Sequence, residues 1–117
     1  MSECIFCRIA AAEMAADIVY ASETSVAFRD MSPQAPVHLL VVPREHHLSA
    51  AEMAAVDAQG LADLFAAVAV VTRDAGIDKT GYRVVTNVGA DSGQEVPHLH
   101  LHVLGGGRLG PLGRVSE

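Results

Sequence analysis

The sequence predicts an α+β fold with a mainly antiparallel sheet, one long helix and a short N-terminal helix. Three observations support this class. Short apolar runs with β character occur on both sides of one helical stretch, consecutive strand-type runs follow one another without helices between them, and the long stretch has helical spacing. A chain of 117 residues fits a single domain, residues 1–117.

The first half of the chain predicts a helix, a hairpin and a buried strand. The alanine-rich segment Cys4–Ala16 is typical of a short helix. Two β-type runs, Ile18–Ala21 and Ser25–Phe28, are separated by a polar turn and predict the hairpin. The prolines of Met31–Pro36 require a loop, after which His38–Val42 predicts a buried strand.

A long helix is predicted between Ser49 and Gly76. Ser49 and Glu52 fit a capping box at its start, and Gly76 is well placed to end it. Apolar residues recur every three or four positions and predict one face that packs on the sheet: Leu61, Leu64, Phe65, Val68 and Val71.

The last part of the chain predicts two further strands. Tyr82–Val88 and Val96–Leu104 have β character, and the turn-rich segment Gly89–Gly93 joins them. The tail from about Arg108 contains little core-forming material, so we expect it to be ordered only against a partner chain.

Composition excludes several classes of function. A formal charge of −6 disfavours a nucleic-acid partner, because nucleic-acid binding requires a basic surface. The longest apolar run, Leu64–Val71, is far shorter than the ~20 residues that span a bilayer, so we expect no membrane association. The N-terminal segment does not fit a secretory signal peptide. We therefore expect a cytoplasmic enzyme.

Three histidines alternate with apolar residues near the end of the chain. On a strand, His98, His100 and His102 would share one face, at intervals of about 6.5–7 Å, and Leu99 and Leu101 would enter the core. A single strand histidine is usually a satisfied polar residue, and three imidazoles can also ligate zinc. Strict alternation of three favours a phosphate-sized ligand surrounded by all of them.

Imidazole chemistry suggests a role for each ring. An unprotonated imidazole can attack phosphorus, and a neighbouring ring can donate to the phosphoryl oxygens as charge develops. The central ring, His100, is best placed to attack. The preceding loop, Gly93–Val96, would bring backbone N–H groups to the mouth of the site as an anion cradle.

The segment HLHLHVL, residues 98–104, resembles the histidine-triad motif. Further matches are CIFCRI, AFRDMSPQAPVHLLVVPREH (27–46) and GYRVVTNVGADSGQEVPHLHLHVLGG (81–106). The chain is similar over nearly its whole length to the nucleotide-binding branch of the histidine-triad (HIT) superfamily. This resemblance implies a five-stranded antiparallel sheet, a homodimer formed through the long helix and the last strands, and hydrolysis of purine nucleoside phosphoramidates through a nucleotidyl-histidine intermediate.

The resemblance also assigns roles to individual residues. His100 matches the nucleophile and His102 the phosphate-binding partner, while His38 and His98 complete the family's four histidines. Asp30 matches the ribose contact, with Met31 beside it. The purine pocket and the phosphate-side contacts correspond to Phe6, Ile9, Phe28, Leu40, Asn87, Gly93, Gln94, Glu95 and Val96. From pattern alone, Asp30 and Asn87 could be turn residues, and the apolar members could belong to the core. Glu95 stands where some members have Ser, and Pro97 where an aromatic residue is common.

Two cysteines have the spacing of a zinc half-site. By resemblance, Cys4 and Cys7 would bind a structural zinc together with His46 and His98, and the chemistry would require no cofactor. The alternative is a pair of reduced thiols. A thioredoxin-like role does not fit, since no βαβ pattern surrounds the motif.

The sequence thus favours a phosphoramidase that acts on AMP- or GMP-linked amines. One rival function is hydrolysis of dinucleoside polyphosphates with the same nucleophile. Another is a purine nucleotide-binding module whose catalysis is incidental.

Overall fold

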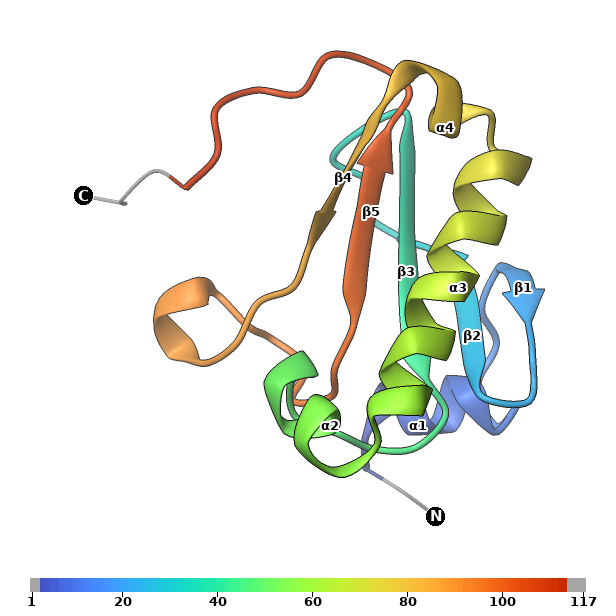
Figure 1. Ribbon diagram of the computed structural model, residues 1–117, viewed down its shortest axis with the longest axis vertical. Helices are drawn as coiled ribbons and strands as arrows, with labels where there is room; N and C mark the ends of the chain where they lie inside the picture. Colours follow the sequence, from blue (N-terminus) through green and yellow to red (C-terminus); the bar gives the residue numbers. More distant parts are fainter. Residues whose placement is uncertain (1–2, 114–117) are drawn as a thin grey trace.

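The computed structural model describes residues 3–113 and contains a five-stranded antiparallel sheet of order β1-β2-β3-β5-β4 (Figure 1). The strands are β1 (Ile18–Ala21), β2 (Ser25–Arg29), β3 (Val37–Pro43), β4 (Tyr82–Val85) and β5 (Leu101–Gly105). The predicted α+β class is confirmed. The last strand in sequence, β5, lies between β3 and β4, so it is central in the sheet.

The helices are α1 (Ile5–Ala10), α2 (Ala50–Val56), α3 (Ala58–Asp74) and α4 (Ile77–Thr80), with a 3-10 turn at Ala90–Ser92. The single helix expected between Ser49 and Gly76 is therefore wrong, because the chain breaks at Asp57. The Asp57 carboxylate accepts a hydrogen bond from the Gly60 N–H at 2.9 Å and caps α3. Ser49 caps α2 in the same way, by accepting from the Glu52 N–H at 3.1 Å.

The first helix ends earlier than its alanine content predicts. Ala12 has a φ of 60°, in the left-handed region. The Glu13 N–H donates to the Arg8 carbonyl at 2.8 Å and the Ala12 N–H to the Ile9 carbonyl at 3.1 Å. These two bonds are those of a Schellman motif, which ends α1 at Ala10 although no glycine is present.

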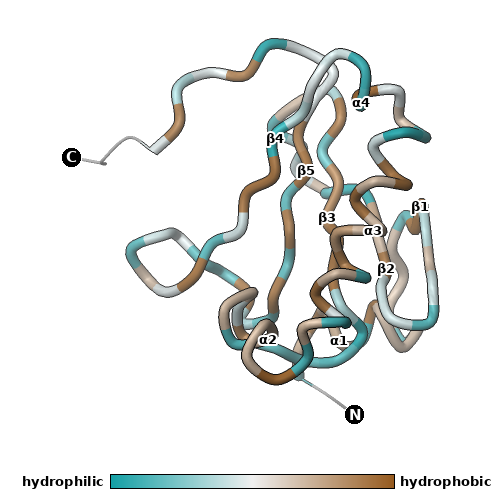
Figure 2. Tube along the Cα trace, viewed as in Figure 1, coloured by the Kyte–Doolittle hydropathy of each residue, from teal (hydrophilic) through white to brown (hydrophobic). Residues whose placement is uncertain are grey.

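The main core lies between α3 and one face of the sheet (Figure 2). Leu64, Val68 and Val71 of α3 are buried there with residues of β3 and β5. Phe65 departs from the expected apolar face, since its side chain is 47% exposed. It follows Leu64 directly, and one residue turns a helix by about 100°, which points Phe65 away from the sheet.

The two C-terminal strands are shorter than predicted. β4 stops at Val85, and the β5 ladder begins at Leu101 rather than at Val96. The Leu99 N–H instead donates to the His47 carbonyl at 2.6 Å, which anchors the segment before β5 to the β3–α2 connection. Within residues 3–113, no helix is long and apolar enough to cross a membrane.

Candidate active site

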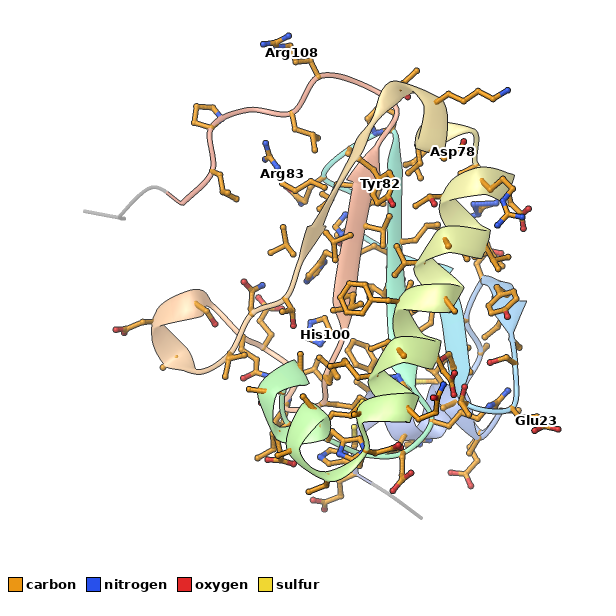
Figure 3. All side chains as sticks on the ribbon, viewed as in Figure 1. Glu23, Asp78, Tyr82, Arg83, His100 and Arg108 are labelled. Carbon is orange, nitrogen blue, oxygen red and sulfur yellow. The ribbon has the colours of Figure 1, made fainter. Side chains whose placement is uncertain are left out.

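The three triad histidines lie on the opposite side of the sheet from the main core, as their alternation predicts. Leu99, Leu101 and Val103 are at most 1% exposed and belong to the α3-side core. Only His102 lies within the β5 ladder, yet the alternation continues back through His100 and His98. In Figure 3 the His100 ring lies on the side of β5 that faces the β4–β5 connection.

The protonation pattern of His100 follows from its hydrogen bond to the backbone. Its Nδ1 lies 2.7 Å from the carbonyl oxygen of His98. A carbonyl can only accept, so Nδ1 carries the hydrogen and the lone pair is on Nε2. The ring is 7% exposed and is fixed by an edge-to-face contact with Phe6, with ring centroids 4.9 Å apart. The direction of the His100 Nε2 lone pair is therefore fixed, which is the geometry that a histidine nucleophile requires.

A chain of hydrogen bonds gives His102 the complementary role. The Gln34 N–H donates to His38 Nδ1 at 3.0 Å, so the hydrogen of His38 is on Nε2. His38 Nε2–H in turn donates to His102 Nδ1 at 2.9 Å, which leaves Nε2–H of His102 as a donor. Burial, followed by the neighbouring His100 and His38, lowers the pKa of His102, so the ring is neutral near pH 7.

A cleft of about 430 Å³ opens beside these two rings. It is lined by Phe6, Asp30, Ser32, Gln34, His38, Leu40, Asn87, Gly93, Glu95, Val96, His100 and His102. Sequence reasoning missed Ser32 and Gln34. Both lie in the proline-containing loop between Asp30 and His38, and that position was the only signal that could have identified them.

Five residues expected at the site do not line the cleft. Ile9 and Phe28 lie behind its apolar wall, where Phe28 packs on Phe6 with ring centroids 5.7 Å apart. Met31 points into solvent and is 98% exposed. Gln94 braces the loop: its side chain accepts from the Gly89 N–H at 2.9 Å and donates to the Val96 carbonyl at 3.2 Å. His98, the fifth, is fully buried.

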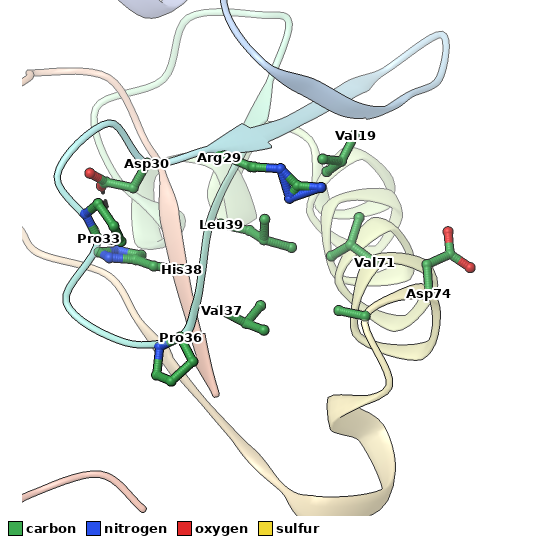
Figure 4. A pocket seen from close by; sticks show the side chains of 11 residues that line it. Val19, Arg29, Asp30, Pro33, Pro36, Val37, His38, Leu39, Val71 and Asp74 are labelled. Carbon is green, nitrogen blue, oxygen red and sulfur yellow. Dashed lines mark ion pairs between the residues drawn. The ribbon is translucent and has the colours of Figure 1, made fainter. Parts of the chain in front are cut away.

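Asp30 is held firmly at the edge of the cleft. Its Oδ1 accepts from the Ser32 N–H at 2.7 Å, and its Oδ2 lies 3.5 Å from His38 Nε2. Asp30 therefore both stabilises the turn through Oδ1 and lines the cleft. Asp30 and His38 also line a second cavity, of about 390 Å³, which extends toward Val71 and Arg29 (Figure 4). The triad residues His98, His100 and His102 do not line this second cavity, whereas His100 and His102 line the first cleft.

The loop before β5 approaches the cleft through a glycine. Gly93 has a φ of 82°, in the left-handed region, and it lines the cleft beside His100 and His102. A residue without a Cβ adopts this conformation without strain and lets a ligand approach the backbone closely.

Four possible metal ligands, Cys4, Cys7, His46 and His98, form a compact group. Cys4 Sγ lies 3.3 Å from His98 Nδ1, and Cys7 Sγ lies 3.4 Å from the same atom and 3.3 Å from His46 Nδ1. All four ligand atoms are within 4.8 Å of one another. Tetrahedral zinc, with Zn–S of about 2.3 Å and Zn–N of about 2.0 Å, keeps sulfur and nitrogen ligands roughly 3.5 Å apart. These residues fit zinc.

His98 is oriented for that role by the backbone. Its Nε2 donates to the Pro43 carbonyl at 3.0 Å, so Nδ1 presents a lone pair to the cysteines. Burial, with a smaller contribution from nearby histidines, lowers the pKa of His98 to about 4, which keeps the ring neutral. His98 therefore contacts the cysteines through Nδ1 and His100 through its carbonyl oxygen.

Charged side chains around the cleft are few. Among the lining residues within 3–113, Asp30 and Glu95 are the only acidic side chains, and no Lys or Arg lines the cleft. A phosphate would be held by imidazole, amide and backbone donors. An antiparallel sheet that presents an oriented imidazole lone pair beside an imidazole donor has the arrangement of a histidine-dependent enzyme.

Comparisons with known proteins agree with this class. The sequence model of the HIT domain matches residues 11–109. The purine nucleoside phosphoramidase of Escherichia coli K12 is 40% identical over 110 residues, which cover 94% of this chain and 92% of that protein. A HIT family hydrolase from Legionella pneumophila superposes with a TM-score of 0.86 at 40% identity, over 91% of this chain and 95% of that one. A histidine triad protein from Clostridium difficile gives 0.90 at 37% identity, over 97% and 98%.

The chain belongs to the HIT domain family and is a hydrolase of that family.

Proposed function

We propose that the protein hydrolyses purine nucleoside phosphoramidates through a covalent intermediate on His100. The observation that carries the proposal is the 2.7 Å hydrogen bond from His100 Nδ1–H to the His98 carbonyl. It leaves the Nε2 lone pair available in the cleft and stabilises the positive charge that the ring acquires when Nε2 bonds to phosphorus. The likeness to the E. coli phosphoramidase supports the same reaction.

The reaction proceeds in two displacements. His100 Nε2 attacks phosphorus, the P–N bond to the amine breaks, and the departing nitrogen takes a proton from solvent. Water then attacks the nucleotidyl-histidine, the P–Nε2 bond breaks, and the nucleoside monophosphate leaves with His100 restored. In both transition states His102 Nε2–H donates to a non-bridging phosphoryl oxygen, where negative charge develops.

The rest of the cleft matches the rest of such a substrate. Phe6, Leu40 and Val96 give an apolar wall that fits a purine ring, and Asp30 offers a carboxylate oxygen to the ribose hydroxyls. Asn87 and Gly93 also line the cleft, and in the proposed complex they would contact the phosphate.

The lack of Lys and Arg among the lining residues of the described chain argues against dinucleoside polyphosphates. Such substrates bring several phosphates, whose charge is normally neutralised by cationic side chains or metal ions.

Turnover of an adenosine phosphoramidate and of diadenosine triphosphate, by wild type and His100→Ala, separates the candidate functions. We expect the wild type to prefer the phosphoramidate and His100→Ala to lose turnover, with circular dichroism as the control for folding. Intact-protein and peptide mass spectrometry of a quenched reaction should find the nucleotidyl group on His100. Near wild-type turnover by His100→Ala would refute the mechanism, and a wild type that binds AMP without turnover would indicate a binding module.

We further propose a structural zinc held by Cys4, Cys7, His46 and His98. The zinc would join α1 to the segment before β5, and the chemistry at phosphorus would proceed without a cofactor. A thiolate pair that binds metal fits the reducing cytoplasm.

We also propose a two-fold homodimer formed through α3 and the β4 edge of the sheet. Phe65 on α3 and Tyr82 on β4 are 47% and 42% exposed, and β4 is an edge strand that could pair with a second copy.

A further inference from the structure

The two carboxylates of the cleft lie in different surroundings. The Asp30 side chain is 19% exposed and is held by the Ser32 N–H. Glu95 is exposed, and within residues 3–113 its carboxylate makes no hydrogen bond or ion pair. Its charge therefore stands at the mouth of the cleft without a protein partner.

The direction of attack leads toward this mouth. His100 is buried at 7% exposed, whereas Glu95 on the same cleft is exposed, so Nε2 of His100 would approach phosphorus from the buried side. In phosphoryl transfer the attacking and leaving atoms lie roughly in line with phosphorus between them. The leaving group would thus depart away from His100, toward the exposed side of the cleft where Glu95 lies.

We infer that Glu95 selects the leaving group, favouring amines that carry positive charge. This inference rests on the proposed phosphoramidase function. As the P–N bond breaks, the electron pair goes to nitrogen, which takes one proton from solvent to leave as the amine and a second to become an ammonium group. A carboxylate at the mouth stabilises that cation and any further cation on the amine, and it repels an anionic leaving group.

Three substrates with the same chain length test the selection: AMP joined through nitrogen to butylamine, to putrescine and to γ-aminobutyrate. They present a neutral, a cationic and an anionic tail. The ratio of kcat/KM for the putrescine and butylamine conjugates should fall by about three- to tenfold in Glu95→Gln, as expected for one charge pair ~6 Å apart in a mostly aqueous mouth. Glu95→Lys should reverse the order of the cationic and anionic substrates.

Asp91→Asn is the matched control, because Asp91 is an exposed carboxylate of the same loop that does not line the cleft. It should leave the ratio within twofold of wild type. Added salt should reduce the wild-type preference more than that of Glu95→Gln. Each ratio is taken within one variant, so a general loss of activity or folding does not imitate the effect.

The outcomes separate the two proposals. If wild type does not turn over the butylamine conjugate, the proposed function fails. If it does, and Glu95→Gln keeps the wild-type ratio, the role of Glu95 is overturned while the phosphoramidase remains. An equal shift in Asp91→Asn would also overturn it, because the preference would then come from the general acidity of the chain.

Discussion

Replacing Asp30 with alanine is expected to lower kcat/KM for a ribose-containing phosphoramidate by about 10- to 150-fold. The geometry sets this range. Oδ1 is used by the Ser32 N–H, so Oδ2 is the oxygen left to accept from a ribose hydroxyl. A hydrogen bond to a charged group contributes about 1.5–3 kcal/mol, and each 1.4 kcal/mol corresponds to about tenfold.

A substrate that lacks both ribose hydroxyls isolates this contact from other effects of the substitution. The kcat/KM of wild type should be lower by the same factor, about 10- to 150-fold, for the deoxygenated conjugate than for the ribose conjugate. The kcat/KM of Asp30→Ala should be nearly equal for the two conjugates. Asp30→Asn keeps an oxygen for the Ser32 N–H but loses the charge, and it should fall between the two.

Steady-state kinetics with both conjugates and all three proteins complete a double-mutant cycle. Equal losses of Asp30→Ala on the two conjugates would show that Asp30 supports only the loop or the His38 ring, and the assignment of the ribose contact would be refuted.

Three further predictions concern metal, pH and assembly. Purified protein should contain one zinc ion per chain by elemental mass spectrometry. The double variant Cys4→Ser, Cys7→Ser should lose the zinc and have a lower thermal midpoint of unfolding. If chelation abolishes the activity of protein that is still folded, and zinc restores it, the metal is not purely structural. Since burial lowers the pKa of His102 from 6.5, the unfolded chain binds its proton more readily, so the free energy of unfolding should fall as pH drops below 6.5. Urea titrations at several pH values should show that the free energy of unfolding falls less steeply with decreasing pH in His102→Gln than in wild type. An equal pH dependence in the two proteins would count against a lowered pKa of His102. Phe65→Glu should convert a dimer into a monomer in light scattering, with the wild type as reference, and a monomeric wild type would disprove the proposed assembly.

The sequence predicted what depends on local periodicity. Leu99, Leu101 and Val103 enter the core as expected, because side chains alternate on extended backbone whether or not a hydrogen-bonded ladder forms. The two misjudged helix boundaries depend on single residues. Ala12 ends α1 in a conformation that sequence patterns assign to glycine, and Asp57 interrupts an apolar pattern that otherwise runs on.

The site was less accessible to sequence reasoning because its contacts join distant segments. Cys4 and His98 are 94 positions apart yet lie 3.3 Å from each other, and only family resemblance suggested the pair. Gln34 acts on His38 through its backbone N–H, a group that every residue except proline has, so its identity gave no signal.

The central place of β5 ties catalytic competence to completion of the sheet. This strand follows the other four in sequence, yet it inserts between β3 and β4 and brings His102 with it. Any intermediate that lacks this insertion has its β-structure divided into a three-stranded part and an isolated β4, and it has no assembled reaction centre. Recovery of turnover during refolding should therefore track this final long-range pairing, the kind of step that is slow because distant parts of the chain must meet.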